Sequence, residues 1–248
     1  MKYTRSTVAD QDICKVTFLA DQKTLNYVIS QAQAKAPYTH INNPSAKKRT
    51  KQEVYNAQLL GTLADYACSD LLRSYLNRYA PIPLITERYD DIRTDEYKKP
   101  DMFDTRVLNP TNNKVLSEIE IRSSVCNQIP LEPMIKTWHV LGWYVTQNKP
   151  AEKIRDFYMR PIYHYNLYNT GKPYALRDAE SHLMSGALDL FIVGGATPQL
   201  IETEGEVQKK FGLLQEGATY QVVHIKNSMG VGESLKAIMD LCVSRVDL

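Results

Sequence analysis

The sequence predicts an α/β protein. Three observations lead to this fold class: a long amphipathic helix begins after Thr50, a β-hairpin follows within residues 103–123, and two strands near the C-terminus each precede a helical pattern. Strand-helix units in succession favour a sheet whose faces are covered by helices. We therefore expect one α/β core that carries the hairpin.

The N-terminal segment is predicted to be an appendage to that core. It contains a strand-like run, KVTFLA at 15–20, and a helix-like run, TLNYVISQAQAK at 24–35. Two prolines then bracket a polar stretch, which is typical of a connection. The expected organisation is an appendage at 1–45 and a single domain at 46–248.

The clearest helix of the chain follows Thr50. Thr50 and Glu53 have the S/T-x-x-E spacing of a capping box, and Pro81 and Pro83 end the helix after Tyr79. Its apolar residues recur at intervals of three and four, as on one face of a helix. They are Leu59, Leu60, Leu63, Ala64, Ala67, Leu71, Leu72 and Tyr75.

The hairpin is predicted from two β-rich runs around a turn sequence. FDTRVL and KVLSEIEIRS flank the residues NPTNN at 109–113. Because side chains alternate along a strand, one face carries the apolar pair and the other carries the charged residues. The apolar pair is Ile119 and Ile121, and the charged residues are Glu118, Glu120 and Arg122.

The rest of the chain contains further elements with weaker signals. Residues 130–147 are apolar and mixed, which we interpret as a helix, and residues 156–168 read as a strand that Pro161 interrupts at an edge or a bulge. Strands are predicted at 187–195 and 219–225. The helical patterns after them cover residues 198–212 and 232–246.

Composition excludes several classes of protein. The formal net charge is +2, because 30 basic and 28 acidic residues nearly cancel, so a polyanion partner would need local clustering. Neither a signal peptide nor an apolar run of the roughly 20 residues of a membrane span is present, so we expect a cytoplasmic protein with no membrane partner. The four cysteines are far apart and are expected to be reduced and buried. None of the five histidines has metal-ligand spacing to another, and we expect them to be structural or exposed.

The hairpin has the residues that a metal-dependent nuclease needs. Such an enzyme requires carboxylates that converge on Mg²⁺, and a cation for the charge that develops on phosphorus. Asp104 begins the first strand, and Glu120 and Arg122 lie on the second. An acid on one strand and an acid-x-cation on its partner can share a face.

These residues resemble a known pattern. PDMFDTRVLNPTNNKVLSEIEIRSS is similar to the motif of the PD-(D/E)xK nuclease superfamily, in which an acid opens a strand and an apolar-E-apolar-K run follows. Asp104 matches the first acid, Glu120 the second and Arg122 the lysine, while Asp101 is an alternative for the first acid. The resemblance covers roughly residues 50 to 126.

The resemblance implies a restriction endonuclease-like core, with a central mixed β-sheet flanked by helices. In that superfamily the preceding helix often adds an acid to the metal site, and LLGTLADYA, which contains Asp65, is similar to it. The implied metal ligands are therefore Asp104, Glu120 and Asp65, with Mg²⁺ as the cofactor and Mn²⁺ as a substitute. Further candidates near this site are Asp101, Glu118, Ser123 and Gln58.

The implied function is hydrolysis of DNA phosphodiester bonds by an endonuclease of restriction or defence type. Lys98, Lys99 and Arg93 are candidates for contacts to the nucleic-acid backbone. RNA stays open as a substrate, and a homodimer is a possible assembly.

Arg122 departs from the pattern, because an arginine keeps its proton and cannot act as a base. A degenerate protein that binds nucleic acid or a partner without cleaving is the alternative. A nucleotide site at IVGGATP is a third idea, against which a tight turn is favoured because the phosphate-binding glycine motifs are missing.

Overall fold

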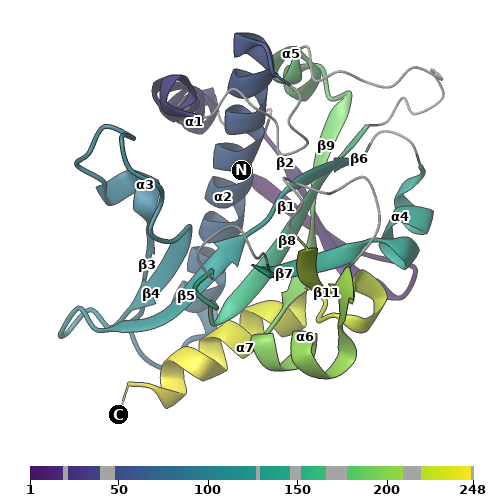
Figure 1. Cartoon of the computed structure of the whole chain (residues 1–248). Helices are drawn as coiled ribbons and strands as arrows, with labels where there is room; N and C mark the ends of the chain where they lie inside the picture. Colours follow the sequence, from purple (N-terminus) through teal and green to yellow (C-terminus); the bar gives the residue numbers. More distant parts are fainter. Residues whose placement is uncertain are drawn as a thin grey trace.

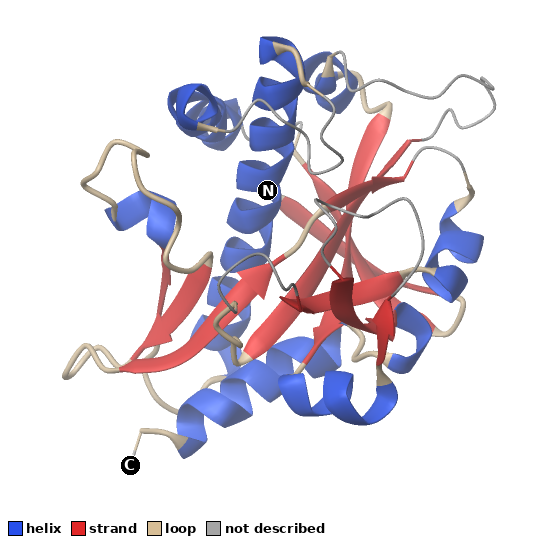
Figure 2. Cartoon of the chain, viewed as in Figure 1, coloured by secondary structure: helices blue, strands red, loops and turns tan. Residues whose placement is uncertain are grey.

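The computed structural model is an α/β protein with a central mixed sheet of eight strands and a second sheet of three (Figure 1, Figure 2). The predicted fold class is confirmed at this level. The structure describes residues 1–18, 22–39, 48–126, 129–145, 152–165, 178–208 and 219–246.

The central sheet is mixed because β8 (Phe157–Tyr165) runs parallel to two of its neighbours. These neighbours are β5 (Val115–Ile121) and the short β6 (Ser124–Cys126), and the other pairings are antiparallel. The order across the sheet is β1-β2-β9-β8-β5-β4-β3. The strands not yet given are β1 (Lys2–Val8), β2 (Gln11–Thr17), β3 (Ile85–Arg88), β4 (Thr105–Leu108) and β9 (Leu188–Ala196).

One face of this sheet packs against helices. The long helix is α2, and its predicted capping box is present: the Glu53 N–H donates to Thr50 Oγ1 at 3.1 Å, and the Thr50 N–H donates to the Glu53 carboxylate at 2.7 Å. A single apolar core joins the helices to the sheet. The helices of this layer are α1 (Gln22–Lys35), α2 (Lys51–Tyr79), α5 (Ala179–Met184) and α7 (Val231–Ser244).

The small sheet covers the opposite face. Along β9, Leu190 and Ile192 belong to the core on the helix side, whereas Phe191 and Val193 belong to the core under the small sheet. A strand that is buried on both faces has a continuous apolar sequence, which is why β9 could be predicted from the sequence. This layer contains β7 (His139–Val145), β10 (Glu206–Gln208), β11 (Thr219–His224), α4 (Leu131–Thr137) and α6 (Pro198–Glu204).

The N-terminal segment is part of the central sheet. β1 and β2 pair with each other, and β2 pairs with β9 through Cys14 opposite Ile192. Ile13, Cys14 and Val16 are buried. The segment that we expected to be an appendage thus supplies two strands to the core.

Two predicted helices are shorter than expected. The segment 130–147 forms α4 only as far as Thr137, and then continues as β7. Likewise α6 ends at Glu204, and β10 follows, while residues 209–212 lie outside the described part. A short apolar run is compatible with either a helix or a strand. Here both β7 and β10 are strands because they pair with β11.

Pro161 lies in a central strand, so the predicted edge position is wrong and the predicted bulge is confirmed. The register between β8 and β9 shifts between Met159 and Pro161, and Arg160 faces both Val193 and Gly194. Gly194 has φ +105°, and a Cβ atom there would lie 1.9 Å from the carbonyl oxygen of Met229. The glycines of IVGG are therefore needed inside β9, where the backbone approaches the loop before α7.

The described part has three further features. A one-turn helix, α3 (Tyr89–Ile92), connects β3 to the loop before the hairpin. All four cysteines are buried and unpaired with one another, as predicted. None of the helices in the described ranges has both the length and the apolar character needed to cross a membrane.

Candidate active site at the hairpin

The hairpin forms as predicted from β4 and β5. Thr105 lies opposite Ile119, and the turn is closed by the Asn109 N–H, which donates to the Lys114 carbonyl at 2.9 Å. Ile119 and Ile121 are buried, while Glu118 and Glu120 are half-buried on the other face. The predicted separation of apolar and charged residues is confirmed.

Asp104 lies between carboxylates from two other elements. Its Oδ2 accepts a hydrogen bond of 2.6 Å from the N–H of Ile121. Burial raises the pKa of Asp104 well above its usual range, and the nearby carboxylates of Asp65 and Glu120 raise it further. The structure therefore brings α2, the start of β4 and the end of β5 together around one acid.

Asp65 points from α2 toward the same region. Burial raises the pKa of Asp65 to about 7, although Lys35 and Arg88 act in the opposite direction. Asp65, Asp101 and Asp104 all line one recess of the surface. The helix acid that the resemblance implied thus lies beside both candidates for the first acid.

Glu120 is close to Asp104 but is held by cations. Its carboxylate lies 3.5 Å from Arg122 and 3.5 Å from Arg155. Burial raises the pKa of Glu120, and Arg122 counteracts part of this effect. Among the described residues, the carboxylate oxygens of Asp65, Asp104 and Glu120 do not all come within 4.8 Å of one another, so at least one of these side chains must move before the three share one ion.

Arg122, in the lysine position of the motif, is engaged on several sides. It forms an ion pair with Glu152, and its guanidinium lies over the rings of Tyr144 and Tyr220, at 5.9 and 5.3 Å from their centroids. Burial disfavours the charged form, but Glu120 and Glu152 outweigh burial and raise the pKa of Arg122. The arginine is charged and fixed.

Asp101 belongs to an ion-pair network. Its carboxylate lies 2.5 Å from Lys35 and 2.7 Å from Arg93. Asp104 has no such cation partner within the part of the chain that the structure describes, and instead accepts the backbone hydrogen bond from Ile121. A carboxylate that is already neutralised by two cations is a weaker metal ligand, so the geometry favours Asp104 as the first acid.

The three residues that were predicted to contact the nucleic-acid backbone differ in accessibility. Arg93 has a side chain only 3 % exposed, and it pairs with Asp90, Asp95 and Asp101. These pairs occupy its guanidinium, which removes Arg93 from the predicted nucleic-acid contacts. Lys98 and Lys99 are exposed, with Lys98 also 2.7 Å from Glu96.

The remaining predicted site residues are Glu118, Gln58 and Ser123. Glu118 is 2.6 Å from Lys153 and 2.6 Å from Arg155, and these cations lower its pKa despite partial burial. Gln58 is half-buried on α2, and Ser123 is half-buried after β5. None of the three lines the recess that contains Asp104.

Sequence reasoning missed the residues that come from distant segments. Lys35 reaches Asp101 from α1, and Glu152 and Arg155 reach the hairpin from the segment before β8. No short motif marks them. For Glu152 and Arg155 the signal is the parallel pairing of β5 with β8, which places the start of β8 beside Glu120.

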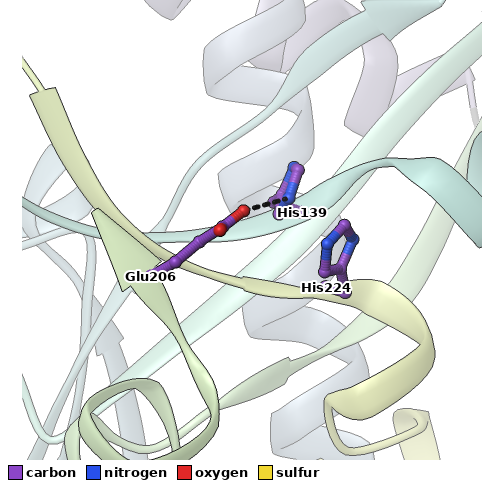
Figure 3. Close-up of side chains that lie close together, drawn as sticks. All are labelled: His139, Glu206 and His224. Carbon is purple, nitrogen blue, oxygen red and sulfur yellow. Dashed lines mark ion pairs between the residues drawn. The ribbon is translucent and has the colours of Figure 1, made fainter. Parts of the chain in front are cut away.

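Histidines were also missed. His139 and His224 lie next to each other in the small sheet, beside Glu206, with ring centroids 4.1 Å apart and ring planes tilted by 35° (Figure 3). Neither has metal-ligand spacing in the sequence. Burial and the neighbouring His224 lower the pKa of His139. Since β7 was expected to be a helix, its pairing with β11 could not be foreseen.

Comparison with known proteins gives one distant relative. The chain is 26 % identical over 223 residues to the uncharacterized protein MJECS01 of Methanocaldococcus jannaschii, and the match covers 82 % of this chain and 77 % of that protein. No protein family matches the chain. No solved structure matches it either.

Proposed function

We propose that this protein is a Mg²⁺-dependent endonuclease that hydrolyses DNA phosphodiester bonds, of restriction or defence type. The observation that carries the proposal is the position of Asp104 between Asp65 and Glu120. Carboxylates that raise one another's pKa in a buried site are stabilised by a bound cation, and perturbed acids of this kind concentrate at functional sites.

The donor set suits Mg²⁺, which prefers carboxylate oxygens. Asp104 and Asp65 would hold the ion, and Glu120 would join them after leaving Arg122 or Arg155. When bound, the ion would hold the scissile phosphate and lower the pKa of an attacking water. Arg122 keeps its charge and is placed to stabilise negative charge on the phosphate.

The fold is consistent with the proposal. The resemblance to the PD-(D/E)xK superfamily implied a central mixed sheet flanked by helices, an acid before one hairpin strand and an acid on the preceding helix. The corresponding features here are the eight-stranded sheet, Asp104 and Asp65. Lys98 and Lys99 are exposed in the loop that precedes Asp104, where a DNA backbone could pass.

Cleavage of plasmid DNA tests the proposal. The wild-type protein should nick or linearise the plasmid with Mg²⁺ or Mn²⁺ and be inactive with EDTA. Asp104→Ala and Glu120→Ala should both abolish cleavage, while the exposed Asp240→Ala, on α7, should retain it. Full activity in both hairpin variants would refute the assignment.

A second candidate is a nuclease-fold protein that binds nucleic acid or a partner without cleaving it. The observation in its favour is that Glu120 and Arg122 are already paired, with Arg155 and Glu152. A wild-type protein that binds DNA in a salt-sensitive way, but neither binds Mn²⁺ in calorimetry nor cuts DNA or RNA, would support this candidate against the first.

A further inference from the structure

A second constellation of metal-binding side chains lies in the small sheet, apart from the hairpin acids. His139 on β7 pairs directly with His224 on β11, and Glu206 on β10 pairs with Val222 of the same strand. Val222 and His224 are two residues apart and so face the same side of the sheet. The strand register therefore places two imidazoles and one carboxylate on one face, as Figure 3 shows.

The spacing of these groups approaches that of a metal site. One ligand atom from each residue lies within 4.8 Å of the other two, and His139 Nε2 is 3.7 Å from Glu206 Oε1. Ligand atoms about 2.0–2.1 Å from a tetrahedral zinc ion are about 3.3 Å apart. We expect side-chain rotations to close the difference.

Two ring nitrogens at this position have no hydrogen-bond partner among the residues that the structure describes. His139 Nε2 and His224 Nδ1 are both buried, and neither has a hydrogen-bond partner within the described residues. Buried polar atoms without a partner are rare in folded proteins and call for an explanation, of which a missing ion is one. A carboxylate beside them adds the negative charge that a divalent ion needs.

The backbone around the histidines is held firmly. Arg160 Nε donates to the carbonyl of His139 at 2.9 Å, and the N–H of Ile225 donates to the carbonyl of Trp138 at 2.9 Å. These bonds fix β7 and the end of β11 beside each other. Glu206, in contrast, has a side chain 64 % exposed on a strand of three residues, so it can adjust and is open to solvent.

We propose that His139, His224 and Glu206 form a binding site for a divalent transition metal ion of the zinc class. Two imidazoles and a carboxylate suit zinc and its neighbours in the first transition row, whereas Mg²⁺ prefers an all-oxygen set such as the hairpin acids. Three protein ligands leave a fourth position for water or another ligand. The bound ion would also link β10 to β7 and β11.

Metal titration of the full chain tests the site. After treatment with a chelator and dialysis, the protein should bind one Zn²⁺ per chain in calorimetry, in the presence of excess Mg²⁺. Zn²⁺ should bind equally well to the Asp104→Asn variant, in which the hairpin site is impaired. Absence of Zn²⁺ binding, or its loss in Asp104→Asn, would overturn the proposal.

Substitutions then identify the ligands. Glu206→Gln is expected to weaken Zn²⁺ binding by at least about tenfold, since even the residues that only support metal ligands have effects of this size. The matched control is Glu204→Gln, another exposed acid two residues away, which should bind as the wild type does. Unchanged affinity in Glu206→Gln contradicts the site.

His139→Gln and His224→Gln should each abolish the visible absorption of bound Co²⁺. Their circular dichroism is compared with that of the wild type, and because Glu206 is exposed, the Glu206→Gln result stands even if a histidine variant does not fold. Co²⁺ absorption that persists in folded histidine variants would also refute the proposal.

Discussion

Asp104 Oδ2 accepts a 2.6 Å hydrogen bond from the backbone N–H of Ile121, which fixes the acid before β4 to the last residue of β5. The bond orients the carboxylate without neutralising it. The position of this acid is therefore set by the hairpin itself, and a bound cation would favour the charged form that burial and the neighbouring acids disfavour.

The first prediction separates the two candidates for the first acid. Asp104→Asn keeps an acceptor for the Ile121 N–H and removes an acid whose raised pKa shows that its charged form is costly in this buried site, so the melting temperature of the metal-free protein should stay equal or rise. Cleavage should fall by at least about 100-fold. Asp101→Asn breaks pairs with Lys35 and Arg93 and should lower the melting temperature while retaining activity. The reverse pattern would make Asp101 the first acid.

The second prediction concerns pH. The pKa of Asp65 rises from 3.8 to about 7 in the folded state, so the folded protein holds this proton more tightly than the unfolded chain. The stabilisation is complete below about pH 4 and is lost as pH rises toward 7, with a slope of at most about 1.4 kcal/mol per pH unit. Urea unfolding of metal-free protein between pH 4 and 8 measures it.

Asp65→Asn is the control for this pH dependence. The amide does not titrate, so the free energy of unfolding should fall less steeply over the same pH range. Equal slopes in the two proteins would show that Asp65 has an ordinary pKa. Mn²⁺ should raise the stability of the wild type most at pH 7 and above, where the carboxylate is charged.

The third prediction contrasts two basic residues of the same loop. Arg93 is buried among Asp90, Asp95 and Asp101, and its removal leaves Lys35 as the main cation for Asp90 and Asp101 and breaks the pair with Asp95. Arg93→Ala should lower the free energy of unfolding by about 3–5 kcal/mol. Lys98→Ala, which breaks only an exposed pair, should change it by less than about 1 kcal/mol. Similar losses in both variants, measured by urea unfolding, would contradict the buried network.

The fourth prediction tests the DNA contacts of the exposed lysines. The double variant Lys98→Ala, Lys99→Ala should bind DNA more weakly than the wild type, and the slope of log affinity against log salt should fall in magnitude by about 2. Fluorescence anisotropy at several salt concentrations gives the slope. An unchanged slope would place the DNA elsewhere. Lys236→Ala, on α7, is the matched control.

The fifth prediction compares two glycines. Gly194→Ala puts a methyl group against the carbonyl oxygen of Met229 in a backbone conformation that L residues rarely adopt, and should cost roughly 2–4 kcal/mol. Gly61 lies within α2 with open space around its Cα, so Gly61→Ala should add about 0.5–1 kcal/mol. Thermal unfolding of both variants gives the two signs, and a tolerated Gly194→Ala would contradict the close approach.

The parts of the fold that the sequence predicted are those with local signals. α2 has its own cap at Thr50 and prolines beyond its end, and the hairpin has two strand-like runs joined by five turn residues. β9 is apolar on both faces and needs no partner to be recognised. Each of these elements is specified within about 30 residues of chain.

The parts that were missed depend on partners far away. β7 is a strand because β11 pairs with it, and Pro161 is tolerated in the middle of the sheet because the register of β9 shifts opposite it. Within the candidate site, Asp104, Glu120 and Arg122 share one hairpin and could be predicted together. Glu152 and Lys35 come from other segments of the chain. Their contacts depend on the tertiary fold, so no residue spacing in the sequence predicts them.

The pairing of β2 with β9 also sets an order of events during synthesis. Cys14 on β2 pairs with Ile192 on β9, which is synthesised much later. At 5–20 residues per second, roughly 10 to 40 s pass between the synthesis of β2 and that of β9. Until then the apolar side chains of Ile13 and Val16 have no sheet to join. Folding of the central sheet is therefore completed late, when β9 pairs with β2.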